Sequence, residues 1–450
     1  MRRVAILMAG IAALACAGPL YAQDAAPVAD VAPAPLAAPA PVALPAPVTN
    51  TDVQPFYAAH PGTLVWLRDA DTRAAAARLV EILKRAPIDG LVQGPALAAS
   101  VEAALASGTP ADDAIVSTAW VRYVDALKAP VAEVGYGDPA LALKRPAASA
   151  ILSAALAAPS LVVHLDQVAS VNPLYAALRG DAIAQGREDD PHVRASLDRL
   201  RLVPATGRAV LVDVANQQMM MLEDGVAVDT MKVIVGKEKA QTPLLAGTIH
   251  YVTFNPYWHI PQDVAKRVVA PLVLKRGVAY LKAAKYQAVA AFGGDKEEPI
   301  DPTTIDWKAV AAGTVEANIR QLSGPNNMMG KMKFGFANDQ GIFLHDTPHK
   351  NLFAKAKRNL SLGCVRLEHP ERLAQWLLGR EPTPPGDGSE QNVLIDTPDH
   401  RGVPVYITYL TARPDGDQLA FAPDVYGLDA PDAAPDKMLA TASAPTSASR

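Results

Sequence analysis

The spacing of apolar residues divides the chain into two parts. From about 51 to 205 they recur at helical spacing. The segments that predict helices are 71–86, 95–108, 111–128 and 147–158. Asp71 is a candidate helix cap and Gly108 a candidate helix stop. We expect the aromatic residues of this part to pack in its core, namely Trp120, Tyr123 and Tyr175.

At about residue 208 the pattern changes to period-two alternation. Residues 208–236 are rich in Val and Met and carry turn signals at Asn216 and Asp224, which predicts a β-meander. Residues 262–290 return to helical spacing. Further strand-like runs follow at 333–336, 341–346, 392–396 and 404–410. The mixture predicts an α+β fold, with an antiparallel sheet and a helical insertion at about 262–320 as a candidate lid.

The N-terminus has the composition of an export signal. Arg2 and Arg3 precede an apolar run of roughly 15 residues, shorter than the roughly 20 of a membrane span. We expect cleavage after Ala22 and no transmembrane segment thereafter. Processing as a lipoprotein at Cys16 ranks second, because an alanine stands where a lipobox favours leucine.

Biased composition marks two further segments and completes the expected domain plan. Residues 23–50 are mostly Ala, Pro and Val and predict a stiff linker, and residues 413–450 predict a disordered tail. The plan is signal peptide 1–22, linker 23–50, helical domain 51–205, sheet domain 206–412 and tail 413–450.

Charge excludes some partners. The net charge of −4 becomes −6 when Arg2 and Arg3 are removed, and no basic block interrupts the sequence. This does not favour a nucleic-acid partner or a polybasic membrane contact. Half of the residues are apolar, which allows two domains with a sizeable core.

Cys364 is the one cysteine left after export, so it has no partner for an internal disulfide. A buried, inert cysteine is one explanation. The other is a nucleophile, because His345 stands 19 positions earlier at the end of an apolar run. Gly363 and Cys364 form a turn whose N–H groups suit an oxyanion. Asp346, through its side chain or its carbonyl, is expected to orient the imidazole.

These residues resemble the catalytic motif of the bacterial L,D-transpeptidases (YkuD-type), in which Ser/Thr-x-Gly-Cys-x-Arg follows a histidine. Here the motif runs from Ser361 to Arg366. The similarity covers about 206–410 and favours the longer proteobacterial branch. Its further motifs are NPYWHIP at 255–261, GPNNMMGKMKF at 324–334, HDTP at 345–348 and NLF at 351–353. The helical part is similar to the scaffold domain of that branch.

The resemblance implies that Cys364 is the nucleophile, His345 its base, and Gly363 with Cys364 the oxyanion donors. Ser361 would position the turn and Arg366 would shape the site. It also implies a β-sandwich-like domain with a capping subdomain, no cofactor or metal, and sensitivity to carbapenems. The export signal leads us to expect a periplasmic location. We expect no metal, because the histidines and Cys364 lack the spacing of zinc ligand pairs.

The chain departs from the family pattern at three points. Leu362 replaces a frequent histidine, Phe343 replaces a common tyrosine, and we find no peptidoglycan-binding module. Without the tyrosine hydroxyl, the backbone N–H groups would have to supply more of the stabilisation of the oxyanion. The candidate substrate contacts are Tyr257, Trp258, Asn326, Asn327 and Phe343. Packing under the lid is an equal alternative for Tyr257 and Trp258, and turn formation is the simpler role for the asparagines.

The expected reaction joins peptidoglycan stem peptides through a cysteine thioester, with the side-chain amine of diaminopimelate as acceptor. The cross-link would join third to third residues, or first to third. Other reactions could proceed through the same thioester intermediate. These are carboxypeptidase or endopeptidase activity and D-amino-acid exchange. An alternative of another class is a non-catalytic protein that anchors to the wall and uses the proline-rich linker as an extended spacer.

Overall fold

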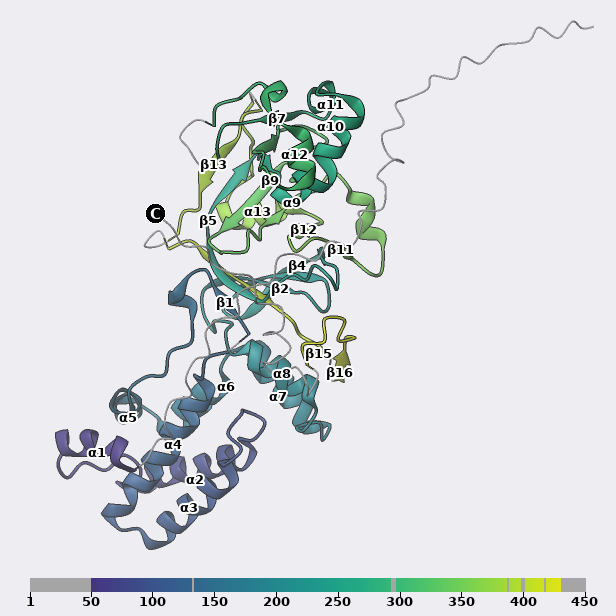
Figure 1. Cartoon of the computed structure of the whole chain (residues 1–450). Helices are drawn as coiled ribbons and strands as arrows, with labels where there is room; N and C mark the ends of the chain where they lie inside the picture. The colour runs from purple at the N-terminus through teal and green to yellow at the C-terminus, as the bar shows by residue number, and fades with distance from the viewer. Residues whose placement is uncertain are drawn as a thin grey trace, which may run out of the picture.

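The structure is a computed structural model that describes residues 50–131, 133–292, 297–386, 388–397, 401–416 and 418–429. The expected signal peptide, most of the linker and the last residues of the expected tail lie outside these ranges. A helical part is followed by a sheet-rich part (Figure 1), which confirms the α+β fold. In the described ranges, no helix is both long and apolar enough to cross a membrane.

Helices α1 to α8 build the N-terminal domain. They are α1 (Asn50–Ala59), α2 (Ala70–Arg85), α3 (Gly94–Ser107), α4 (Asp113–Leu127), α5 (Ala148–Ala157), α6 (Leu161–Ser170), α7 (Pro173–Ala184) and α8 (Pro191–Leu200), with 3-10 turns η1 (Pro110–Asp112) and η2 (Pro139–Leu141). The three aromatic residues expected in the core are buried, and α3 ends at Gly108 as predicted. The cap of α2 is Asp69 rather than Asp71, because Asp69 and Thr72 bond each other reciprocally in a capping box.

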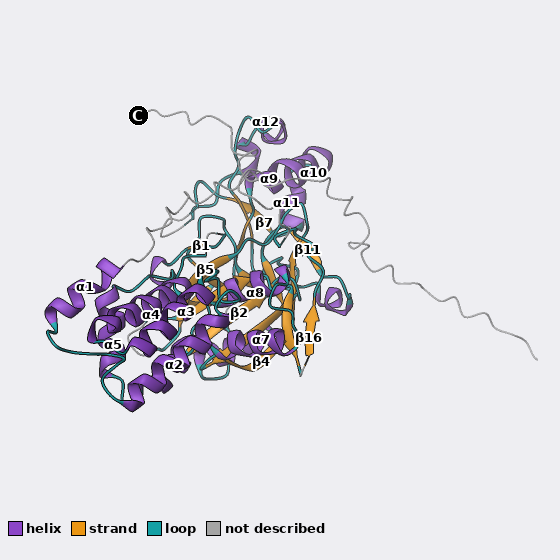
Figure 2. Ribbon diagram, turned by 90° about the horizontal axis from the view of Figure 1, so that it is seen from below, coloured by secondary structure: helices purple, strands orange, loops and turns teal. Residues whose placement is uncertain are grey.

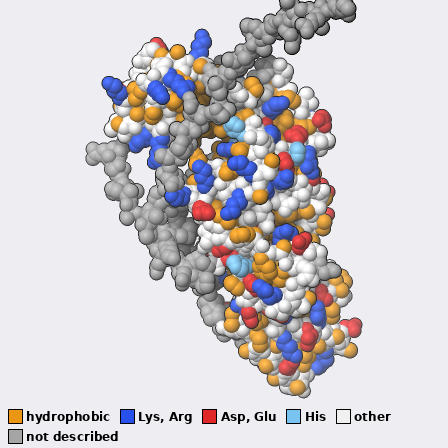
Figure 3. Space-filling view, turned by 90° about the vertical axis from the view of Figure 1, so that its right-hand side faces the viewer, with side chains coloured by type: hydrophobic (Ala, Val, Ile, Leu, Met, Phe, Trp, Pro, Cys, Tyr) orange, Lys and Arg blue, Asp and Glu red, His pale blue; other side chains and the backbone are white. Residues whose placement is uncertain are grey.

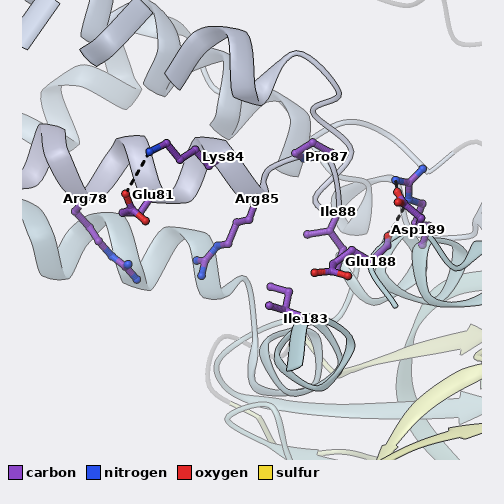
Figure 4. Close-up of a pocket in the computed structure, with 10 residues that line it drawn as sticks. Arg78, Glu81, Lys84, Arg85, Pro87, Ile88, Ile183, Glu188 and Asp189 are labelled. Carbon is purple, nitrogen blue, oxygen red and sulfur yellow. Dashed lines mark hydrogen bonds and ion pairs between the residues drawn. The ribbon is translucent and has the colours of Figure 1, made fainter. Parts of the chain in front are cut away.

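A cleft of about 660 Å³ opens beside α2 in this domain (Figure 4). Its lining residues are Arg78, Glu81, Lys84, Arg85, Pro87, Ile88, Ile183, Glu188, Asp189 and Arg194. Lys84 pairs with Glu81 across 3.8 Å, and Arg194 pairs with Asp189. All ten residues belong to the helical domain, so this cleft is separate from the cysteine motif.

The predicted meander is present as β2 (Arg208–Asp213), β3 (Gln218–Glu223) and β4 (Val226–Gly236). The turn between β3 and β4 falls at Asp224 and Gly225, both with positive φ, as the Asp-Gly signal predicted.

The main sheet closes on itself. Its other strands are β1 (Gly135–Tyr136), β5 (Leu245–Phe254), β9 (Met332–Phe336), β10 (Leu344–His345), β11 (Asn359–Ser361), β12 (Val365–Leu367), β13 (Gln391–Leu394) and β14 (Val403–Thr408). The order β5-β14-β2-β3-β4-β12-β10-β9 ends where β9 pairs with β5 again. Most pairs are antiparallel, but β10 and β12 run parallel. Helix α13 (Pro370–Leu378) begins at the predicted Pro370 and buries its apolar face in the core, and η5 (Lys350–Ala354) precedes β11.

Residues 258–321, here called the cap, form a subdomain with its own core, in the region of the predicted insertion. It contains the strands β6 (Trp258–His259), β7 (Tyr286–Ala288) and β8 (Ile319–Gln321) and the helical segments α9 (Gln262–Val264), η3 (Ala265–Val269), α10 (Ala270–Arg276), α11 (Ala279–Ala283), η4 (Pro302–Thr304) and α12 (Trp307–Ala312). The cap and helices α1 to α5 lie at opposite ends of the molecule (Figure 1).

The expected disordered tail is wrong for its described residues. β15 (Ala412–Asp415) and β16 (Gln418–Phe421) form a hairpin that contacts α7 and α8, which lie next to the strands in Figure 2. The fully buried carboxylate of Asp429 pairs with Arg199 of α8 across 2.6 Å. The partners of this segment lie about 200 residues earlier, so its own composition could not reveal them.

Candidate active site

Two neighbouring strands bring the predicted base and nucleophile together. In the parallel pair of β10 and β12, Leu344 lies opposite Val365 and His345 lies opposite Arg366. Leu344 and Val365 are fully buried in the core. Because side chains alternate along a strand, His345 and Arg366 lie on the other face. Cys364 lies in the turn directly before β12, and the charge of Arg366 acts on both Cys364 and His345.

Ser361 holds the turn that carries the thiol. Its hydroxyl donates to the Cys364 carbonyl at 2.6 Å and accepts from the Gly363 N–H at 3.2 Å. Gly363 has φ +122°, a conformation that other residues rarely adopt, and a Cβ there would lie 3.1 Å from Ile342. Glycine at position 363 is therefore required by the backbone conformation of the turn.

The two expected oxyanion donors differ in availability. The Gly363 N–H already donates to Ser361. Among the described residues, the Cys364 N–H has no hydrogen-bond partner. In this conformation Cys364 therefore offers the available backbone donor.

His345 is held as a neutral base. Its Nδ1 lies 2.5 Å from the carbonyl oxygen of Asp346, which can only accept, so Nδ1 carries the proton and Nε2 is left to receive one. Burial, reinforced by the positive charge of Arg366, lowers the pKa of His345 to about 4. Asp346 thus orients the ring through its carbonyl, one of the two routes considered from the sequence.

The side chain of Asp346 fixes the segment that holds the ring. Its carboxylate accepts from the Lys331 N–H at 2.8 Å and pairs with Lys350 across 2.8 Å. It packs against Gly330, where φ is +64° and a Cβ would lie 2.3 Å from Asp346 Oδ2. Gly330 therefore leaves the space in which Asp346 sits.

The Cys364 thiol forms no disulfide and is partly exposed. Burial raises its pKa, although a hydrogen bond from the Phe343 backbone and the charge of Arg366 oppose the rise. Its Sγ donates to the Gly341 carbonyl at 3.6 Å, and no hydrogen bond joins it to His345. The resting pair is therefore a neutral thiol beside a neutral imidazole.

Arg366 supplies positive charge to this face. Its Nε is buried and lacks a hydrogen-bond partner among the described residues. Burial lowers the pKa of its guanidinium, while the nearby Cys364 opposes that change. An incompletely paired guanidinium beside a thiol favours an anion at this position.

The aromatic candidates for substrate contact are engaged by the protein. Trp258 packs on the core of the cap. The guanidinium of Arg320 lies 4.7 Å from the ring centre of Tyr257, and Lys333 Nζ lies 5.2 Å from that of Phe343. Packing thus accounts for Trp258 and Tyr257, whereas Phe343, opposite the thiol turn, lies nearest the motif.

The two asparagines differ. Asn327 is buried, and its side-chain amide donates to the carbonyls of Pro256, Gln321 and Leu322, each at 3.1 Å, while its oxygen accepts from Met329. It therefore serves the turn rather than a substrate. Asn326 is exposed.

Two residues that support the turn have no signature in the sequence. The buried Thr242 donates to the Gly363 carbonyl at 2.6 Å and accepts from Gly236 N–H at 2.8 Å. Tyr426 donates to the Gly236 carbonyl at 2.6 Å. Thr242 lies 121 positions from Gly363 and 184 positions from Tyr426, so only the fold brings these residues together. Within the described ranges, no cluster of three or more His, Cys, Asp or Glu side chains could hold a metal.

Comparison with known families identifies these domains. Residues 207–407 match the L,D-transpeptidase catalytic domain and residues 51–180 match the scaffold domain. The chain therefore carries an L,D-transpeptidase catalytic domain with a scaffold domain N-terminal to it, which confirms the resemblance drawn from the motif.

The chain is also similar to individual proteins. A Haemophilus influenzae protein named provisionally as an L,D-transpeptidase is 29% identical over 234 residues, 51% of this chain and 46% of that protein. The chain thus spans about half the length of that curated relative.

Solved structures show weaker likeness. An L,D-transpeptidase from Mycobacterium smegmatis is 12% identical, covers 45% of this chain and 58% of its own, and has a TM-score of 0.22. A structure titled the Ldtfm-avibactam carbamoyl enzyme is 13% identical, covers 46% and 50%, and has a TM-score of 0.20. These scores are too low to support an inference about this chain.

Proposed function

We propose that the protein is a periplasmic L,D-transpeptidase that cross-links the stem peptides of peptidoglycan. The observation that carries the proposal is that β10, which ends at His345, pairs with β12, which directly follows Cys364, within an L,D-transpeptidase catalytic domain. The export signal expected from the sequence supports the location.

In the acylation step, the thiol turns from Gly341 towards His345, and Sγ attacks the carbonyl carbon of an L-centred residue in the donor stem. His345 Nε2 accepts the thiol proton, and the Cys364 N–H stabilises the tetrahedral oxyanion. The peptide bond then breaks, and the leaving amine takes the proton from the imidazolium. The donor acyl group remains on Cys364 as a thioester.

In the second step, the side-chain amine of diaminopimelate from another stem attacks the thioester. His345 accepts a proton from the amine and returns it to the departing sulfur, so an amide forms and the thiol is restored. The donor residue is the third or the first of its stem. Carbapenems would acylate the same thiol and block the reaction.

Muropeptide profiling tests this proposal. The mature protein or its Cys364→Ala variant is incubated with peptidoglycan that lacks L,D cross-links, and products are resolved by liquid chromatography and mass spectrometry. We expect cross-linked dimers with the wild type alone, and their fragmentation reports the donor residue. Shortened monomers would instead identify a hydrolase, and exchanged terminal residues a D-amino-acid exchange enzyme. Identical profiles from reduced wild type and variant would favour the anchoring protein.

A further inference from the structure

The helical side of the cap carries an excess of positive charge. Residues 262–288 contain six cations and one acid, a net charge of +5, whereas the whole chain carries −4 and the remainder therefore −9. The six are Lys266, Arg267, Lys275, Arg276, Lys282 and Lys285, and all are exposed. They occur as two adjacent pairs, Lys266–Arg267 and Lys275–Arg276, and two single lysines, so no basic run is longer than two residues.

These cations have no acidic partners. No ion pair joins any of the six to an acidic side chain among the described residues, whereas other exposed cations such as Lys84 and Arg194 are paired. Surface charges of both signs are usually interspersed, and an unneutralised cluster of one sign creates a local potential that attracts the opposite charge.

The cationic side is held by the core of the cap. Val269, Val273 and Leu281 are buried, so the helices η3, α10 and α11 present their other residues to solvent. Figure 3 shows Lys and Arg side chains gathered over the lobe that the cap forms. Five of the six cations therefore stand on helical segments, and Lys285 follows the end of α11.

We propose that this surface binds the carboxylates of peptidoglycan stem peptides and so holds the polymeric wall against the catalytic domain. This inference rests on the proposed function. The stem peptides of peptidoglycan repeat free carboxylates along each glycan chain, and their negative charge is complementary to the cations of the cap. Each exposed contact is weak, but several on one polymer act together. Binding is accordingly sensitive to salt.

The test is co-sedimentation of the mature chain with purified sacculi at low and high salt. The variants are Lys275→Glu with Arg276→Glu, and Arg267→Glu with Lys282→Glu. The charge-matched control is Lys144→Glu with Arg380→Glu, two exposed cations outside the cap. We expect each cap variant to bind sacculi about tenfold or more weakly. We expect the control to bind like the wild type, and high salt to release the wild type.

A second readout separates this surface from the active site. Acylation of Cys364 by a carbapenem, measured by intact mass, should be unchanged in the cap variants, which also shows that they are folded. Equal binding by cap variants and wild type, or equal loss in the control, would overturn the proposal. Binding to vesicles of phosphatidylglycerol and phosphatidylethanolamine but not to sacculi would overturn it in favour of a membrane partner. A wild type that binds sacculi through these cations but forms no new muropeptide would contradict the proposed function and leave the surface intact.

Discussion

The carboxylate of Asp346 occupies the space beside Gly330 that a side chain would fill, with Oδ2 2.3 Å from the position of an ideal Cβ. The carbonyl of the same aspartate receives the hydrogen bond from His345 Nδ1. The orientation of His345, the base of the proposed mechanism, therefore depends on a glycine 15 positions earlier.

Replacing Gly330 by alanine should displace Asp346 and with it the imidazole. We expect acylation by a carbapenem to slow by about tenfold or more. The free energy of unfolding should fall by about 1 to 3 kcal/mol, because the left-handed backbone is strained as well. Gly379→Ala is the control, since Gly379 has φ +65° with open space around it. Equal slowing in both variants would show that backbone strain, not the displaced aspartate, is responsible.

The protonation states of Cys364 and His345 predict how the reactivity of the protein depends on pH. Because burial raises the pKa of Cys364 and lowers that of His345 to about 4, the thiol should lack thiolate absorbance at neutral pH. The rate of alkylation by iodoacetamide should keep rising through the alkaline range. A thiolate–imidazolium pair would instead give an alkylation rate that is constant between about pH 5 and 8. That result would contradict the neutral state of Cys364 and His345.

Burial of His345 also links folding to pH. Its pKa of about 4 lies below the ordinary 6.5 of an unfolded histidine, so the unfolded chain binds the proton more readily. Stability should be full above pH 6.5 and fall as the pH drops towards 4, by on the order of 3 kcal/mol. Denaturant titrations of wild type and His345→Gln should show this part of the slope in the wild type only.

Arg366 should tune both members of the pair in the same direction. Its charge lowers the pKa of Cys364 and that of His345, so Arg366→Leu should raise both, and Arg366→Lys should retain part of the effect. Alkylation profiles report the thiol and NMR titration reports the imidazole. If activity fell while both titrations stayed unchanged, Arg366 would act on the substrate rather than on the pair.

The support that Thr242 gives the thiol turn should be measurable. Thr242→Val leaves the Gly236 N–H and the Gly363 carbonyl without their partners, and we expect a loss of about 1 to 3 kcal/mol together with slower acylation. Thr248 is a matched control, because it is also buried and hydrogen-bonded, to Asp138, but does not touch the turn. Thr248→Val should lose stability without slowing acylation of the folded enzyme.

Local patterns in the sequence predicted the local elements. The meander over 208–236, the end of α3 at Gly108 and the start of α13 at Pro370 each depend on residues within one or two turns of the chain. The pairing of His345 with the cysteine segment came from a motif, and the register of β10 and β12 gives its physical basis.

The contacts that the sequence could not show are long-range. Thr242 and Tyr426 act on the thiol turn through contacts that depend on the closed sheet, and neither lies in a motif named above. Gly330 lies in the motif at 324–334, but its contact with Asp346 appears only in the fold. Asp71 does not cap α2. Asp69, two residues earlier, has the extended backbone of an N-cap residue, and its side chain accepts the hydrogen bond from the Thr72 N–H. For Asn327 the sequence allows a substrate contact but makes turn formation the simpler role, and its bond to the Pro256 carbonyl, 71 positions earlier, appears only in the fold.

The segment after β14 has a consequence for how this protein can be divided. Tyr426 donates a hydrogen bond to the Gly236 carbonyl at the end of β4, beside the thiol turn, and Asp429, three residues later, pairs with Arg199 of α8. A catalytic domain cut at 407, where the family match ends, would lack both contacts. The helical domain and the thiol turn are thus joined through this C-terminal segment. A chimera that exchanges either domain must therefore keep residues 409–429 and α8 from the same protein.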